Sequence, residues 1–269
     1  MKKIVRVGIF DSGVGGLTVL AECVRKLPDC LFYYMGDNLH APYGSLPPDL
    51  IAHYVFAALR RFARLGTDAV ILACNTATAV CAERARAAFP FPVIGMEPAV
   101  RPAAEVCRHV LVLATPLTAG SDRLRALVGR FPQTDFTVCP LPGLAGAIER
   151  SLARGESLTI SDHLPKGQYD GVVLGCTHYV FFRDEIARFY GCRTFDGGVG
   201  TANRLQSVLS HRFPSMDFGT DDHARPKQNP NICFNKKCKE MPKKGVIFLG
   251  KSRKINKSVY YTNICFKNN

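Results

Sequence analysis

The chain has 269 residues, and 47% of them are hydrophobic, which is enough to bury one large core or two smaller ones. No stretch approaches the roughly 18 uninterrupted apolar residues of a membrane-spanning helix. The opening residues, M-K-K-I-V-R-V-G-I-F-D, contain an apolar run too short for a signal-peptide core, and they indicate a first strand. We therefore expect no membrane anchor and a cytoplasmic location.

The formal net charge of +13 is concentrated at one end of the chain. Residues 221–269 hold 12 Lys and Arg against 3 Asp and Glu, whereas residues 1–220 hold 23 against 19. The first 220 residues are therefore nearly neutral, and nucleic-acid binding has no support there. The 11 cysteines form no C-x-x-C pair, so we expect free thiols and no metal site.

Short apolar runs alternate with amphipathic helical segments over the first 205 residues. In chain order, the expected strands and the helices that follow them are 5–10 with 15–27, 69–74 with a helix through residue 88, 110–115 with 121–131, and 171–176 with 181–190. Continuous apolar strands of this length are typical of parallel sheets that helices cover on both faces. The pattern predicts an α/β protein of the open, wound type.

Small polar residues follow each of the four expected strands. Because ligands bind beyond the carboxyl ends of parallel strands, these residues predict a functional site at that edge. The four groups are Asp11-Ser12-Gly13, Cys74-Asn75-Thr76, Thr115 to Thr118, and Cys176-Thr177-His178.

Two of these strands have almost the same sequence. D-A-V-I-L-A-C-N-T at 68–76 and D-G-V-V-L-G-C-T-H at 170–178 place Cys74 and Cys176 102 residues apart (176 − 74). The repetition favours two similar wound parallel-sheet domains, with a boundary near residues 92–98 and the active site at their interface. We assign residues 1–97 to the first domain and 98–205 to the second, with a return to the first at about 206–220.

Residues 221–269 differ in composition from the rest of the chain. They contain 10 lysines and 7 asparagines, against 4 and 3 in residues 1–220. Either the coding origin changes after about Asp222, by frameshift or fusion, or the segment is a basic interaction tail. Cys233 and Cys238 lack a second pair at zinc spacing, so they do not predict a metal site.

The paired cysteines suggest proton transfer at a carbon atom. A thiol beside the N-terminus of the next helix lies where a thiolate is stabilised. Two such thiols could face each other across one ligand, one removing a proton as thiolate and the other delivering one. A covalent hydrolase would instead use one cysteine with a histidine base, and a disulfide redox pair would lie closer in sequence. No motif predicts a cofactor, because D-S-G-V-G-G lacks the features of a nucleotide-binding loop.

Four motifs together resemble the glutamate racemases of the aspartate/glutamate racemase superfamily. They are F-D-S-G-V-G-G-L-T-V, A-P-Y-G, A-C-N-T-A-T and G-C-T-H-Y, and the likeness extends from about Val7 to Arg204. The resemblance implies a cofactor-independent isomerase that interconverts L- and D-glutamate and supplies D-glutamate for peptidoglycan, and so for cell wall biogenesis and cell shape. We also expect a homodimer. Residues beyond about Thr220 match nothing in the family and are expected to lie outside its fold.

The resemblance assigns roles to individual residues. Cys74 and Cys176 match the two catalytic cysteines, Asp11 matches the acid near the first, and His178 matches the helper of the second. Glu149 matches a catalytic glutamate near that histidine. Hydroxyl, amide and backbone N–H groups suit the two carboxylates of the substrate, and an acid suits its ammonium. The expected substrate-binding residues are Asp11, Ser12, Tyr43, Gly44, Asn75, Thr76, Thr118, Thr177 and His178.

Two alternatives stay open. An aspartate racemase of the same superfamily tends to carry an acid after the second Cys-Thr pair, where this chain has His178. A catalytically inactive amino-acid-binding protein would keep the fold without the reaction.

Overall fold

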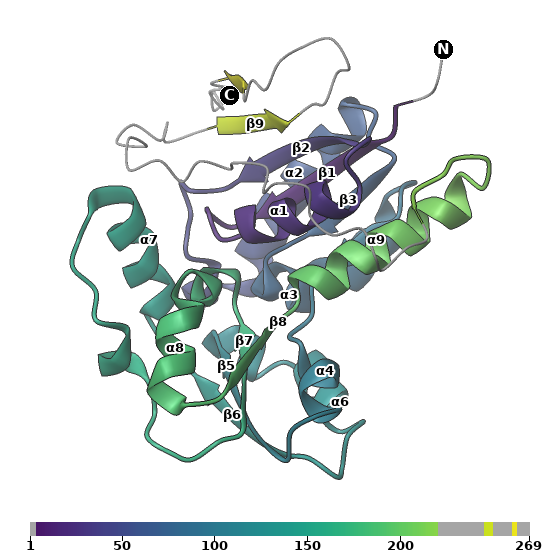
Figure 1. Cartoon of the computed structure of the whole chain (residues 1–269). Helices are drawn as coiled ribbons and strands as arrows, with labels where there is room; N and C mark the ends of the chain where they lie inside the picture. The colour runs from purple at the N-terminus through teal and green to yellow at the C-terminus, as the bar shows by residue number, and fades with distance from the viewer. Residues whose placement is uncertain (1–3, 220–244, 250–259, 263–269) are drawn as a thin grey trace.

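The computed structural model describes residues 4–219, 245–249 and 260–262, and it contains two sheets with helices on both faces of each (Figure 1). The predicted α/β fold with two wound parallel sheets is confirmed. Asp222, Cys233 and Cys238 lie outside the described residues, as does most of the tail, so the expectation that residues 221–269 lie outside the family fold stays a prediction. Within the described ranges, no helix combines the length and the apolar character needed to cross a bilayer.

The first sheet has the strand order β10-β9-β2-β1-β3-β4. Its four parallel strands are β1 (Arg6–Asp11), β2 (Leu31–Gly36), β3 (Ala69–Leu72) and β4 (Val93–Gly95). Two short strands from the tail extend it, because β9 (Gly245–Leu249) pairs antiparallel with β2, and β10 (Tyr260–Thr262) pairs antiparallel with β9.

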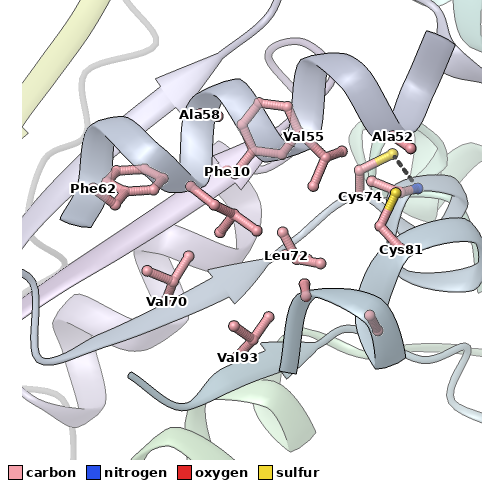
Figure 2. Close-up of a cluster of buried hydrophobic side chains, with 14 of the residues drawn as sticks. Phe10, Ala52, Val55, Ala58, Phe62, Val70, Leu72, Cys74, Cys81 and Val93 are labelled. Atoms are coloured by element: carbon pink, nitrogen blue, oxygen red, sulfur yellow. Dashed lines mark hydrogen bonds between the residues drawn. The ribbon is translucent and has the colours of Figure 1, made fainter. Parts of the chain in front are cut away.

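Two hydrophobic clusters cover the faces of this sheet. One packs α2 (Pro48–Arg64) and α3 (Asn75–Ala88) on one face, and Figure 2 shows side chains of this cluster around Leu72. The other packs α1 (Leu17–Lys26) and α9 (Gly198–Arg212) on the opposite face. Because β1 and β3 are buried on both faces, they read as continuous apolar runs in the sequence.

The second sheet has the order β6-β5-β7-β8, and its strands are all parallel. The strands are β5 (His109–Ala114), β6 (Asp135–Pro140), β7 (Gly171–Gly175) and β8 (Arg193–Asp196). One face carries α7 (Leu144–Arg154), η2 (Ile160–His163), η3 (Thr177–Phe182) and α8 (Arg183–Tyr190), and the other carries α4 (Val100–Ala104) and α6 (Asp122–Val128). The short helices η1 (Tyr43–Ser45) and α5 (Pro116–Ala119) lie between the two sheets.

The chain passes from the first sheet to the second between β4 and β5. It returns to the first sheet along α9, which packs on that sheet. We propose that the first domain ends near residue 97 and that the chain returns to it along α9. The expected limit at residue 205 falls inside this helix, whose Ala202 and Leu205 already pack against the first sheet.

The acids that open the duplicated segments have a structural role in both sheets. Asp68 accepts a hydrogen bond from the N–H of Arg6 at the start of β1, and Asp170 accepts two from the N–H groups of Arg108 and His109 at the start of β5.

Candidate active site

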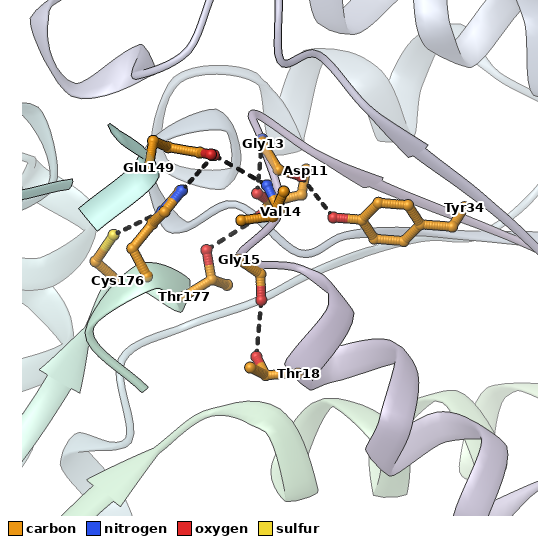
Figure 3. Close-up of polar contacts among 10 residues, drawn as sticks. Asp11, Gly13, Val14, Gly15, Thr18, Tyr34, Glu149, Cys176 and Thr177 are labelled. Carbon is orange, nitrogen blue, oxygen red and sulfur yellow. Dashed lines mark hydrogen bonds and ion pairs between the residues drawn. The ribbon is translucent and has the colours of Figure 1, made fainter. Parts of the chain in front are cut away.

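A buried hydrogen bond between Asp11 and Thr177 joins the carboxyl end of β1 to that of β7. Asp11 is the last residue of β1 and is fully buried, and its Oδ2 accepts a hydrogen bond of 3.1 Å from the hydroxyl of Thr177 (Figure 3). Thr177 opens η3, immediately after Cys176 and β7. The two sheets therefore present their strand ends to each other, in agreement with the prediction, from the two similar segments, of a site at the interface of two domains.

Cys74 caps the N-terminus of α3 (Figure 2). Its Sγ accepts a hydrogen bond of 3.4 Å from the N–H of Ala77. Burial, followed by the negative charge of Asp11, raises the pKa of Cys74 to about 12, against opposing hydrogen bonds from Ser12 and Ala77. The N–H of Ala77 at the N-terminus of α3 lowers the pKa, as expected of a place that stabilises a thiolate, but burial and the charge of Asp11 outweigh it. The charge of Cys176 adds to the same shift, so the two thiols are electrostatic neighbours.

Cys176 has a histidine as its partner. Nδ1 of His178 lies 3.6 Å from Sγ of Cys176, and Nε2 lies 2.7 Å from Oε1 of Glu149. Burial alone would lower the pKa of His178, but its hydrogen bonds to Cys176 and Glu149 and the charge of Asp11 raise it well above the ordinary value. The imidazole of His178 therefore joins the sulfur of Cys176 on one side to the carboxylate of Glu149 on the other.

Glu149 reaches this site from α7 because the facing loop contains glycine. Its Oε1 also accepts a hydrogen bond of 2.9 Å from the N–H of Val14. A Cβ at Gly13 would lie 1.7 Å from that oxygen, so only glycine permits the approach. The N–H of Gly13 donates to Oδ1 of Asp11 at 2.9 Å. Burial raises the pKa of Asp11 despite the opposing charge of His178.

A group of hydroxyl residues links α3 of the first sheet to α5 of the second. The Oγ1 atom of Thr76 lies 2.9 Å from Oγ1 of Thr115 and 3.4 Å from that of Thr118. A Cβ at Gly44 would lie 2.9 Å from Cβ of Thr115, so η1 packs closely against the same group. The structure thus gathers three predicted substrate-binding positions in one place.

The remaining predicted substrate contacts are buried near the two thiols. The hydroxyl of Tyr43 donates to Oδ2 of Asp37 at 2.7 Å, so that phenol has a partner within the first sheet. Asn75 is 4% exposed, and neither its side-chain oxygen nor its nitrogen has a hydrogen-bond partner within the described residues. Buried amides of this kind are rare without a ligand or water. A small cavity next to it is also lined by Thr118 and Arg123.

The comparisons with known proteins agree with this geometry. Residues 20–205 match the family model Asp/Glu/Hydantoin racemase. The chain belongs to this family. It is therefore an enzyme of the isomerase class, and the recognition of the four sequence motifs is confirmed.

Curated relatives cover most of the racemase chain. A protein of Halothermothrix orenii named glutamate racemase is 39% identical over 76% of this chain and 85% of its own length. One of Bacillus subtilis named glutamate racemase 2 is 38% identical over 77% and 83%. A crystal structure of Escherichia coli glutamate racemase, in complex with L-glutamate and the activator UDP-MurNAc-ala, superposes with a TM-score of 0.71 at 31% identity, over 78% of this chain and 84% of that one.

The sequence did not indicate one residue of the racemase site, Tyr34. Its hydroxyl, in β2, donates to the carbonyl of Gly13 at 2.7 Å. Thr115, which belongs to one of the four predicted strand-end groups, caps α5 beside Thr76. The run L-F-Y-Y-M-G is followed by Asp37. This is the same pattern of a strand followed by an acid that identified Asp11, and it could have indicated β2. The described residues include no group of three His, Cys, Asp or Glu side chains placed to hold a metal.

Proposed function

We propose that this racemase interconverts L- and D-glutamate without a cofactor. One of Cys74 and Cys176 removes the α-proton of the substrate, and the other delivers a proton to the opposite face of the same carbon. The observation that carries the proposal is the placement of the two thiols after equivalent strands of two sheets, whose ends meet at buried Asp11 through its hydrogen bond from Thr177. The names of the relatives support glutamate as the substrate.

In this mechanism the two thiols begin in opposite protonation states. Cys176, beside protonated His178, is suited to remove the α-proton as a thiolate, and Cys74 holds a proton that it can deliver to the other face. The thiol and thiolate exchange roles for the opposite enantiomer. Each turnover moves one proton to one sulfur and one proton from the other, and no redox step is involved.

Binding of the substrate would lower the pKa of Cys74. Asp11 is the group placed to bind the ammonium of an amino acid, and its negative charge is the second cause of the raised pKa of Cys74. Pairing with a cation cancels that charge, so binding lowers the proton affinity of Cys74. The α-proton is weakly acidic, and fixed donors in a dry site must stabilise the developing negative charge.

Donors for the carboxylates are available around the two thiols. The amide of Asn75, which has no hydrogen-bond partner among the described residues, lies on the interface between the sheets with the hydroxyls of Thr76 and Thr118. Thr177 lies beside Asp11. Ser12, Tyr43 and Gly44 complete the proposed contacts. Glu149 contacts His178 and the N–H of Val14, and no thiol within the part of the chain that the structure describes, so we assign it a positioning role.

The proposed physiological role is the supply of D-glutamate for peptidoglycan by a homodimer in the cytoplasm. The bacterial origin of the glutamate racemase relatives supports this role. Light scattering of the purified protein measures the oligomeric state.

Circular dichroism of the purified enzyme tests the function. With D-glutamate, the ellipticity should decay to zero, and with D-aspartate it should stay constant. Decay with aspartate instead would identify an aspartate racemase. A constant signal with both amino acids would favour the inactive binding protein and refute the proposal.

A further inference from the structure

One peptide unit in the loop after β1 connects the first sheet to the surroundings of Cys176. The carbonyl oxygen of Gly13 accepts a hydrogen bond of 2.7 Å from the hydroxyl of Tyr34. The N–H of the same peptide, on Val14, donates to Oε1 of Glu149 at 2.9 Å. Because a peptide group is planar and rigid, these two side chains hold its opposite ends.

The chain of hydrogen bonds continues to the second thiol. The oxygen of Glu149 that accepts from Val14 is also 2.7 Å from Nε2 of His178, and Nδ1 of that ring lies 3.6 Å from Sγ of Cys176. Hydrogen bonds in series polarise one another in a low-dielectric interior. A donor on the carbonyl of Gly13 therefore strengthens the N–H that holds Glu149.

Tight packing fixes the hydroxyl of Tyr34 at this place. Tyr34 is 3% exposed, and a Cβ at Gly16 would lie 2.9 Å from its oxygen. A Cβ at Gly36 would lie 2.5 Å from the carbonyl oxygen of Gly13. Burial, followed by the charges of nearby acids, raises the pKa of Tyr34 well above the ordinary value, so the phenol keeps its proton and acts as a donor.

We propose that Tyr34 is a positioning residue for proton transfer at Cys176, acting through the Gly13–Val14 peptide on Glu149 and His178. The inference rests on the proposed racemase function and deepens it. Tyr34 lies in the sheet that carries Cys74, yet its hydrogen bond supports the other thiol. The two proton transfers therefore depend on it unequally.

The variant Tyr34→Phe removes the hydroxyl and keeps the ring. We expect kcat to fall about 3- to 10-fold, the effect of losing one hydrogen bond, with little change in KM. The equilibrium constant fixes the ratio of kcat/KM for the two directions, so rates alone do not report which thiol is affected. Isotope effects with α-deuterated L- and D-glutamate do, because the effect grows for the enantiomer that Cys176 deprotonates and shrinks for the other.

Tyr190→Phe is the matched control. Its hydroxyl donates to the carbonyl of Pro165 at 2.7 Å, so the substitution removes a bond of the same kind from α8, outside the site. This variant should keep both kcat and the ratio of the two isotope effects. A ratio for Tyr34→Phe that equals the wild-type value, with or without a slower rate, would overturn the positioning role.

A second variant covers the case in which Tyr34→Phe does not fold. Placing 3-fluorotyrosine at position 34 preserves the shape and makes the phenol a stronger donor, so the isotope-effect ratio should move in the opposite direction. No movement would overturn the inference. If the wild-type enzyme racemises glutamate but the isotope-effect ratio is the same in the variants, only the role of Tyr34 is refuted. If the wild-type enzyme racemises no amino acid, the proposed function is refuted as well.

Discussion

Cys74 and Cys176 end nearly identical sequence segments, yet the structure surrounds them differently. The shared half of each segment is structural, because Asp68 and Asp170 both hold the backbone at the start of a neighbouring strand and the apolar run fills a parallel sheet. The two segments diverge after the cysteine, where Asn75 opens the 14-residue helix α3 and Thr177 opens the short helix η3.

This divergence gives the two thiols different charged neighbours and different hydrogen-bond partners. Cys74 accepts an N–H and lies beside the charge of Asp11, which adds to the effect of burial, whereas Cys176 lies beside a histidine that Glu149 keeps in place. A two-base mechanism needs one acid and one base at the start of each turnover. The duplicated fold supplies the symmetric placement of the sulfurs, and the residues that differ supply the asymmetry.

Serine at either cysteine should have the largest effect. Cys74→Ser and Cys176→Ser each remove one proton-transfer group, and racemisation measured by circular dichroism should fall about 10²–10⁴-fold. Cys192→Ser, at a half-buried cysteine in the second sheet region, is the control and should keep full activity. Full turnover by either active-site variant would refute the two-base scheme.

Substitution of Glu149, the hydrogen-bond partner of His178, should have the second-largest effect on activity. Glu149→Gln replaces the charged acceptor of His178 and Val14 with an amide, and the loss of a charged hydrogen bond predicts a fall in kcat of about 10- to 100-fold. Glu156→Gln, whose exposed carboxylate pairs only with arginines among the described residues, is the matched control. Equal kinetics for the two variants would show that Glu149 does not support Cys176.

The sequence predicts the parts of this site that depend on local pattern. Apolar runs identified β1, β3, β5 and β7, and the residues that follow them indicated Asp11 and the two cysteines. Strands β2, β4, β6 and β8 were not identified, because they are short or only partly buried and so lack a continuous apolar run, and Tyr34 was missed with β2. Contacts such as Thr177 to Asp11, 166 residues apart, depend on how two sheets pack, and no local pattern encodes them.

The raised pKa of Cys74 also could not be predicted from its sequence neighbours. A helix N-terminus alone favours a thiolate, whereas burial and Asp11 act through the tertiary structure. Glu149 was found only through the family resemblance, since nothing in L-A-G-A-I-E shows that the carboxylate meets a histidine 29 residues away.

Removing the charge at position 11 should lower the pKa of the Cys74 thiol. In Asp11→Asn the negative charge next to Cys74 is gone, so the pKa of that thiol should move down from about 12. The pH dependence of alkylation at Cys74, followed by mass spectrometry, should shift to lower pH. Asp162→Asn, at an exposed acid in η2, should leave the profile unchanged. An unshifted profile in Asp11→Asn would show that burial alone sets this pKa.

The smallest expected effect concerns the acid that opens the second segment. Burial alone would raise the pKa of Asp170, but hydrogen bonds from the N–H groups of Arg108 and His109 outweigh it and lower the pKa. A pKa below the unfolded value of about 3.9 means that the stabilisation is present at neutral pH and is lost as the pH falls through the folded-state pKa. Because the carboxylate is exposed, solvent screens it, and Asp170→Asn should cost about 0.5–1 kcal/mol at pH 7.

Denaturant unfolding of wild type and Asp170→Asn across pH measures this contribution. The difference in unfolding free energy should shrink towards acid pH, while Asp162→Asn should match wild type throughout. Racemisation should stay unchanged, because Asp170 lies at the opposite end of β7 from Cys176. A loss of activity without a loss of stability would mean that the shared half of the duplicated segment also takes part in the chemistry, contrary to the division between structural acid and reactive thiol.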